Sequence, residues 1–340
     1  GEARRALARR LAEAAEALGD TAARQQALWN ALDGDPALAG ARRALIGLLT
    51  AEADWAGVKA ALEPATGIGD PATRAAAHTE LAELCAGPLE QPAEAVDHWR
   101  AVQDLVGASA GTLQALRALH QRLDAPAAEA ELLLELAHIA AEPAQAGAHH
   151  ADRARVLETA LDDLDGAAAA WQAALAADPA HPEAPWALHR LWQREGPAAE
   201  HAAVLDVLIG RIDEDDPRAV ELFRARARLR AGGLADPAGA IADFEAVRAR
   251  RPDDAEALRR LAALYGEAGQ TQALVDVLRT QAREEADAAL AADLRLRIAR
   301  LDDGAVGDEA LRAVLAADPA HVAAHAALAE RLEARGHWPA

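Results

Sequence analysis

One serine stands in a spacing that hydrolases use for a nucleophile. The segment Gly107–Gly111 reads G-x-S-x-G, and Ser109 is the only serine of the chain. In α/β-hydrolases this pattern works on a strained turn between a strand and a helix, with a sheet beneath it. Helical sequence precedes the pattern here. It therefore predicts a turn between two helices, with Ser109 or Thr112 as the cap of the second helix.

Two histidines four residues apart, His321 and His325, could hold a metal ion on one helix face. No glutamate follows His321 and no third ligand is evident, so the pattern is not that of a metal site. His321 has a counterpart at His181, and its position also corresponds to Asp254, which indicates a helix start. The single cysteine, Cys85, excludes an internal disulfide and is expected to be buried.

Phosphate-binding and calcium-binding motifs are both incomplete. Lys59 lacks the glycines of a phosphate loop, and the acidic run 213–216 lacks the spacing of an EF-hand. The pair His149 and His150 is adjacent in a stretch that reads as a loop. With no coherent group of catalytic side chains, the sequence predicts a protein that is not an enzyme and has no metal site and no cofactor.

Charge narrows the class of partner. The formal net charge of −20 disfavours nucleic acid and anionic membranes, which bind positive surfaces, and it leaves room for a basic partner. No apolar run reaches the length of a membrane span. Arginine and alanine replace lysine, serine and asparagine, which is typical of a GC-rich bacterial genome. The sequence does not indicate a compartment, and a soluble cytoplasmic protein is the default expectation.

The elements that position these residues recur along the chain. Five anchors are separated by 70, 72, 73 and 67 residues, and each has an apolar residue or alanine three positions on. The anchors are Trp29, Trp99, Trp171, Phe244 and Leu311. Self-similarity at a fixed period is the signature of a repeat protein, in which each unit packs on its neighbours.

Helices account for the whole period. Alanine, leucine, arginine and glutamate dominate, no strand-like alternation occurs, and apolar residues are spaced by three and four. Asp-Pro pairs, such as Asp70-Pro71 and Asp236-Pro237, are expected to mark helix boundaries, because aspartate caps the free N–H groups of a helix start and proline fits the first turn. Glycines such as Gly269 are expected to close them. About nineteen helices result, each taking ~18 residues with its turn.

The stretch from Ala240 to Leu278 resembles the tetratricopeptide repeat. The residues that carry the resemblance are Ala240, Phe244, Val247, Pro252, Leu258, Leu261, Ala262, Tyr265, Gly269, Leu274 and Leu278. The pattern recurs around Trp171 and Leu311, and more weakly near Trp29 and Trp99. The resemblance implies an all-α, right-handed α-solenoid of antiparallel helix pairs over residues 1–340. We expect repeats at 20–88, 89–163, 164–235, 236–302 and an incomplete 303–340, with 1–19 as the last helix of a preceding repeat.

In tetratricopeptide repeats the first helix of each pair lines a concave groove that binds a partner. By position, the resemblance implies a groove formed by Glu183, Trp186, Arg190, Gln193, Arg194, Glu256, Arg259, Ala263 and Glu267. Trp186 beside Arg190 could be a binding hot spot, or Trp186 could fill space beside Pro185. Arginine-rich helices, such as the one with Arg224 and Arg226, could pair with neighbouring carboxylates or form a ladder for an acidic peptide.

Two functions follow from this reading. The first is a protein-interaction scaffold that binds a partner peptide or helix along the groove. The second is a structural subunit that stacks head to tail into a filament, because neither end of the sequence reads as a polar capping helix. The residues expected at such end contacts are Leu7, Leu11, Leu328, Leu332 and Trp338.

Overall fold

The computed structural model describes residues 19–193 and 196–335, together with residues 6, 10, 13, 14, 16 and 17. Within them the chain forms eighteen α-helices and one 3-10 helix, with no strand. It divides into two compact units, Gly1–Ala184 and Pro185–Ala340. The prediction of an all-α helical repeat with about nineteen helices is confirmed. The proposed boundaries of the individual repeats stay a prediction.

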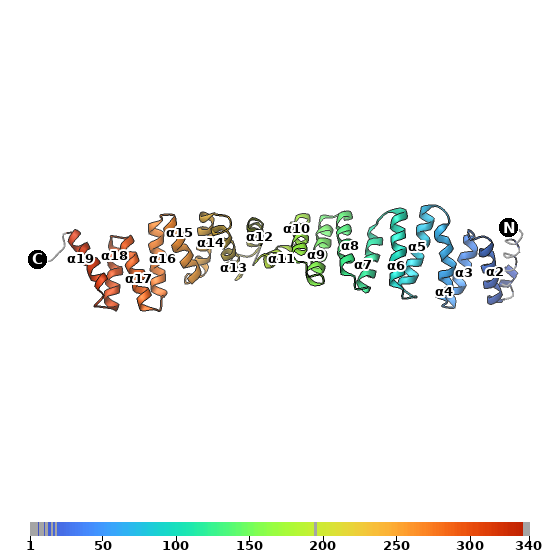
Figure 1. Cartoon of the computed structure of the whole chain (residues 1–340), viewed down its shortest axis with the longest axis horizontal. Coiled ribbons are helices and arrows are strands. Elements are labelled where there is room, and N and C mark those ends of the chain that lie inside the picture. The colour runs from blue at the N-terminus through green and yellow to red at the C-terminus, as the bar shows by residue number, and fades with distance from the viewer. Residues whose placement is uncertain are drawn as a thin grey trace. The chain divides into compact units, whose positions relative to one another are not determined.

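The first unit contains nine α-helices and η1 in its described part. They are α2 (Thr21–Gly34), α3 (Ala39–Ala51), α4 (Trp55–Leu62), η1 (Glu63–Gly67), α5 (Pro71–Ala86), α6 (Pro92–Val106), α7 (Ala110–Arg122), α8 (Pro126–Ile139), α9 (Pro143–Thr159) and α10 (Leu164–Ala177). Each helix packs on the next one along the chain, and neighbours run antiparallel (Figure 1).

The second unit contains the remaining helices. They are α11 (Ala184–Trp192), whose first residue belongs to the first unit, α12 (Ala198–Arg211), α13 (Ala219–Ala231), α14 (Pro237–Arg250), α15 (Ala255–Glu267), α16 (Thr271–Glu284), α17 (Ala288–Leu301), α18 (Ala305–Ala317) and α19 (Val322–Ala334). From α12 onward, consecutive helices again pack pairwise. Small alanines at the contacts, such as Ala240 and Ala257, are fully buried and let the helices approach closely.

The five predicted anchors lie four helices apart, on α2, α6, α10, α14 and α18. Trp171, Phe244 and Leu311 are almost fully buried, whereas Trp29 and Trp99 are half-buried. Around Phe244, the residues that carry the tetratricopeptide resemblance form one core with Val247, Leu258 and Tyr265. The chain is therefore a tetratricopeptide-like helical repeat in which the recurring apolar residues join neighbouring helices.

Asp-Pro pairs mark helix boundaries, but not always helix starts. Asp70 and Asp236 cap α5 and α14 as expected, each accepting a hydrogen bond from the backbone three residues on, with proline next in the chain. By contrast, Asp35, Asp178 and Asp318 follow the last residues of α2, α10 and α18. Their carboxylates accept the N–H two residues on, which stabilises a turn beyond the helix. The predicted boundaries are thus confirmed at these three pairs, where the aspartate follows a helix end and does not cap a helix start.

Two further local predictions have clear outcomes. Gly269 follows the end of α15 with a φ of 67°, the left-handed conformation in which glycine carries no Cβ penalty, so its role in closing the helix is confirmed. The loop expected around His149 and His150 is wrong, because both residues lie inside α9. Neither histidine is a helix-breaking residue, so α9 continues through both positions.

Candidate binding groove

The hydrolase-like motif is a helix cap. Ser109 lies between α6 and α7, and its hydroxyl accepts the Thr112 N–H while the Thr112 hydroxyl accepts the Ser109 N–H, both within 3.2 Å. This reciprocal capping box uses both hydroxyls to satisfy N–H groups that a helix start leaves free. A helix, not a strand, precedes the motif, so the predicted inter-helix turn is confirmed.

The histidines that share a repeat position also cap helices. His321 Nδ1 accepts the Ala324 N–H at 3.3 Å at the start of α19, and His181 Nδ1 accepts the Ala184 N–H at 3.1 Å. Asp254 does the same at the start of α15. The predicted helix-start position is confirmed. In the described part of the chain, no three His, Cys, Asp or Glu side chains gather closely enough to hold a metal ion.

The arginines of α13 are paired with carboxylates. Arg226 binds Asp243 of α14 through two hydrogen bonds of 2.6 and 3.0 Å, and Arg230 binds the same carboxylate at 3.0 Å. Arg228 binds Glu256 of α15, and this hydrogen bond lowers the pKa of that carboxyl. The pairing alternative is therefore confirmed for α13, and its arginines do not form an open ladder for an acidic peptide.

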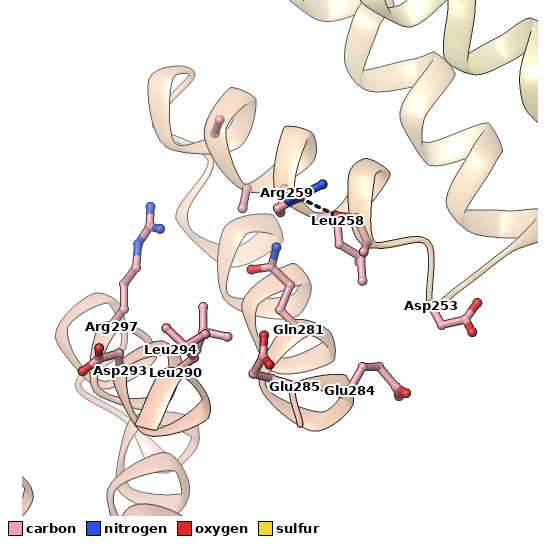
Figure 2. Close-up of a pocket in the computed structure, with 13 residues that line it drawn as sticks. Asp253, Leu258, Arg259, Gln281, Glu284, Glu285, Leu290, Asp293, Leu294 and Arg297 are labelled. Carbon is pink, nitrogen blue, oxygen red and sulfur yellow. Dashed lines mark hydrogen bonds between the residues drawn. The ribbon is translucent and has the colours of Figure 1, made fainter. Parts of the chain in front are cut away.

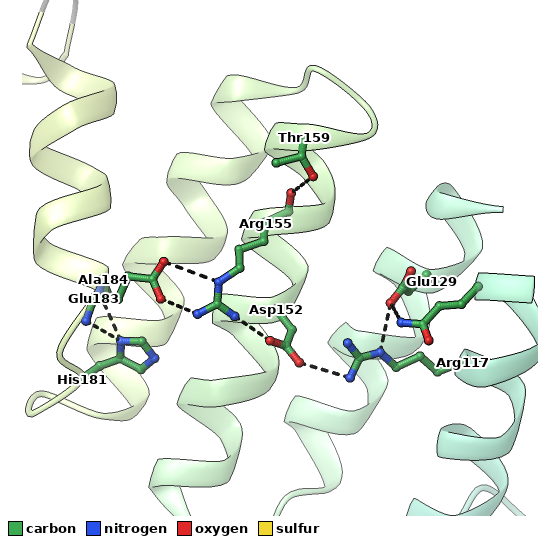
Figure 3. A network of polar contacts seen from close by, with 9 residues as sticks. Arg117, Glu129, Asp152, Arg155, Thr159, His181, Glu183 and Ala184 are labelled. Atoms are coloured by element: carbon green, nitrogen blue, oxygen red, sulfur yellow. Dashed lines mark hydrogen bonds and ion pairs between the residues drawn. The ribbon is translucent and has the colours of Figure 1, made fainter. Parts of the chain in front are cut away.

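A similar ion-pair network occupies the first unit (Figure 3). Arg117 of α7 contacts Glu129 of α8 at 3.0 Å and Asp152 of α9 at 3.1 Å. Arg155 of α9 contacts Asp152 at 2.6 Å and also binds Glu183, just before α11. The network thus joins successive helices, and it includes Glu183, which was expected to face a partner.

Trp186 and the residues expected beside it in the groove differ in burial and in their contacts. Trp186 is half-buried, and the guanidinium of Arg218 lies 4.7 Å from its ring centroid, a cation–π contact within the unit. Arg190 and Gln193 are exposed on and just after α11. Arg194 lies outside the described residues. That these side chains bind a partner stays a prediction.

A cavity of about 740 Å³ lies between α15, α16 and α17 (Figure 2). On α15 and α17 its lining follows the i, i+3, i+4, i+7 spacing that places side chains on one helix face. Those on α15 are Ala255, Leu258, Arg259, Ala262 and Ala263, and those on α17 are Leu290, Asp293, Leu294 and Arg297. Asp253 precedes α15, and Gln281, Glu284 and Glu285 come from the end of α16. We call this cavity the α15–α17 groove.

The floor of the groove is apolar and its rim is charged. Leu258 belongs to the core of the second unit and Leu294 packs against that core, whereas Leu290 is 53% exposed. Arg259 donates to the carbonyl of Ala255 in its own helix at 3.1 Å. Figure 2 shows Arg297 extending from α17 away from Asp293.

Sequence reasoning found only part of this groove. Arg259 and Ala263 line it, as expected from their position on α15. Glu256 does not line it, because this carboxylate faces α13 and binds Arg228 there. Glu267 lies beyond the lining at the end of α15. The contributions of α16 and α17 were missed, although the apolar residues Leu290 and Leu294 on one face of α17 offered a signal.

Of the residues expected at end-to-end contacts, Leu328 and Leu332 are half-buried on α19, and Leu328 packs against a core that includes Leu311. Leu7, Leu11 and Trp338 lie outside the described residues. Among the described residues, none of the helices combines the length and the apolar character needed to cross a bilayer.

Comparison with known proteins finds only distant structural likenesses. Neither protein-family models nor curated proteins match the sequence. A tetratricopeptide repeat protein from Parabacteroides merdae is 14% identical, with 78% of this chain and 99% of that chain covered and a TM-score of 0.30. The tetratricopeptide protein YrrB, described as having an unusual peptide-binding site, is 16% identical over 54% of this chain and 90% of its own, with a TM-score of 0.30. The TPR2AB domain of yeast Sti1 in complex with pHSP90 is 16% identical over 68% and 97%, with a TM-score of 0.28. At these values the likeness carries no argument about function.

Proposed function

We propose that the chain is a non-enzymatic protein-interaction module that binds a segment of a partner protein in the α15–α17 groove. The observation that carries the proposal is the cavity of about 740 Å³, which has an apolar floor and a charged rim. Ligand sites in proteins are concave, of ~300–1,000 Å³, and mostly apolar with a few polar groups that set orientation.

The groove has room because its α15 side is built from alanine. Ala263 is exposed, and the small side chain of Ala262 next to it leaves space beside Leu258. Across the cavity, Leu290 exposes 53% of its surface. A partner side chain that covers Leu290 would remove apolar surface from water, which stabilises the complex by about 25 cal/mol per Å² before the costs of association.

The proposal predicts that filling the groove abolishes binding. A random peptide library displayed on phage is selected on the full chain, and the enriched peptides are then tested on two variants. Ala263→Trp places an indole in the groove, whereas Ala326→Trp makes the same change at an exposed alanine of α19 that does not line it. We expect at least a tenfold loss of affinity for Ala263→Trp, measured by fluorescence anisotropy.

The matched variant should bind like the parent chain, because both substitutions change one exposed helical alanine and cost a similar ~0.5 kcal/mol of helix propensity. Circular dichroism checks that both keep their helicity. Selected peptides that bind Ala263→Trp as tightly as the parent chain would contradict the groove as the binding site.

A further inference from the structure

We infer that the segment bound in the α15–α17 groove is basic and apolar, with lysine or arginine facing the carboxylates of the rim and a large apolar side chain on Leu290 and Leu294. This inference rests on the proposed function, since it names the chemistry of the occupant of the same groove. It is carried by the imbalance of charge around the cavity together with its apolar floor.

Carboxylates outnumber guanidiniums in the lining. Four acidic side chains, Asp253, Glu284, Glu285 and Asp293, face two arginines. All four acids are exposed, and among the described residues Asp253 and Asp293 have no ion-pair partner. Glu284 contacts Arg283, which is itself exposed, at 2.9 Å. Glu285 accepts the backbone N–H of Asp287 at 3.1 Å. A cation entering the groove therefore meets exposed carboxylates, of which Glu284 and Glu285 each make one short contact within their own segment.

The helix ends around the groove also favour a cationic ligand. The C-terminus of α16, at Glu284, borders the groove, and the last carbonyls of a helix carry a partial negative charge. The N-termini of α15 and α17 are capped by Asp254 and Asp287, whose carboxylates accept the first free N–H groups. Those N–H groups are thus not available to an anionic ligand.

An acidic segment finds few cations here. Arg259 donates to its own helix, and the arginines of the nearby α13 are paired with Asp243, Asp254 and Glu256. Arg297 is the one lining arginine with no hydrogen bond or ion pair to the described residues. It can take a single acceptor, such as a backbone carbonyl or a carboxylate of the bound segment.

The spacing on α17 sets the scale of the contact. Leu290 and Arg297 are seven residues apart, which corresponds to about 10 Å along the helix. Between them lie Asp293 and Leu294 on the same face. A bound segment therefore meets apolar, acidic and basic positions within ~10 Å, a length of about three extended residues or two helical turns.

The first experiment measures binding of three labelled peptides of equal length to the full chain. One consists of leucine and lysine, one of leucine and glutamate, and one of serine and lysine. We expect the leucine–lysine peptide to bind at least tenfold more tightly than either of the others, with affinity that falls as salt rises. Equal or tighter binding of the leucine–glutamate peptide would overturn the inference.

The second experiment separates the groove from the overall acidity of the chain. The double variant Glu285→Lys and Asp293→Lys reverses two rim charges, and the double variant Glu330→Lys and Glu333→Lys makes the same charge change on exposed residues of α19. We expect the rim variant to lose about tenfold in affinity for the leucine–lysine peptide and the α19 variant less than twofold.

Equal losses in the two variants would overturn the inference, because the peptide would then respond only to net charge. Ala263→Trp keeps the two proposals distinguishable. If that variant weakens every bound peptide whatever its charge, and the acidic peptide binds best, the groove stands and the inference about its occupant fails. If the variant changes nothing, the proposed function itself fails.

Discussion

At the scale of single residues, several side chains of a type that could do chemistry instead stabilise the helical repeat. Ser109 caps a helix, His181 and His321 do the same, and the carboxylate of Asp243 binds two arginines. Each satisfies hydrogen-bonding groups that would otherwise be left unpaired. In this helical repeat, the position of such a residue at a helix end or at a contact between helices therefore predicts its role better than its residue type does.

Asp243 makes this concrete. Its side chain is only 3% exposed and binds Arg226 at 2.6 Å and Arg230 at 3.0 Å. We predict that Asp243→Asn destabilises the chain by about 3 kcal/mol, because it removes the buried carboxylate and leaves Arg226 and Arg230 with only the exposed Asp206 and Asp236 as partners among the described residues. Urea unfolding followed by far-UV circular dichroism measures the difference.

Asp253→Asn is the matched control, since this aspartate is exposed, lies in the same unit and has no ion-pair partner among the described residues. We expect that variant to stay within about 0.5 kcal/mol of the parent chain. Equal destabilisation by the two substitutions would contradict the importance of the buried network.

Two histidine pairs join adjacent helices. His189 Nδ1 lies 2.9 Å from His201 Nε2 between α11 and α12, and His78 Nδ1 lies 3.1 Å from His98 Nδ1 between α5 and α6. His201 is 4% exposed, and the edge of Trp192 faces its ring. A hydrogen bond between two imidazoles needs one neutral ring as the acceptor, so neither pair keeps its hydrogen bond when both rings are protonated.

This predicts a loss of stability in mild acid. Burial, and then the charge of His189, lower the pKa of His201 to about 4, below the ordinary value near 6.5. Between these values the unfolded chain binds the proton and the folded chain does not, so stability is full above pH ~6.5 and falls as pH approaches ~4, by up to about 3 kcal/mol.

Thermal unfolding between pH 7 and pH 4 measures this effect. Carboxylates also titrate near the lower end of the range, so the comparison is with the double variant His189→Gln and His201→Gln, which can keep a neutral hydrogen bond. We expect the melting temperature of that variant to fall less over the same range. Parallel curves would show that the histidine pair does not contribute.

At the scale of the elements, stability rests on contacts between consecutive helices. Phe244 of α14 is fully buried in a core built from α13 to α18, which it shares with residues of other helices such as Leu258 of α15 and Leu278 of α16. In a repeat protein each element contacts chiefly the elements beside it, so damage is expected to stay local.

We predict that Phe244→Ala costs about 3–5 kcal/mol locally, because it removes a large buried side chain and leaves a cavity. Hydrogen exchange followed by mass spectrometry should show faster exchange in α13 to α16 and little change in α5 to α8 of the first unit. Val306→Ala is a control at a half-buried position of α18. Acceleration spread evenly over both units would contradict local coupling.

At the scale of the whole molecule, composition and charge act together. The formal net charge of −20 raises the local concentration of cationic partners around the chain and speeds their encounter. Part of this negative charge lies at the α15–α17 groove, where four exposed carboxylates surround apolar side chains. We therefore expect added salt to lower the association rate constant of a basic peptide strongly and to change its dissociation rate constant much less.

Sequence by itself determined the helical repeat. Anchors about seventy residues apart fall on every fourth helix, and the capping roles of Ser109, His181 and His321 follow from local backbone chemistry. Such features depend on residues a few positions apart, so periodicity and cap preferences are enough to predict them. The same local rules located helix boundaries at Asp35, Asp178 and Asp318, but they did not decide that these aspartates follow a helix end and do not cap a helix start.

Only the tertiary structure decided which charges stay open to a partner. Glu256 and Arg259 stand three residues apart on α15, yet Glu256 faces α13 and binds Arg228, whereas Arg259 lines the groove. The α17 side of the groove, with Leu290 and Arg297, depends on how two helices separated by α16 come together. Ion pairing and exposure are properties of neighbours far apart in sequence, and the pattern along one helix does not contain them.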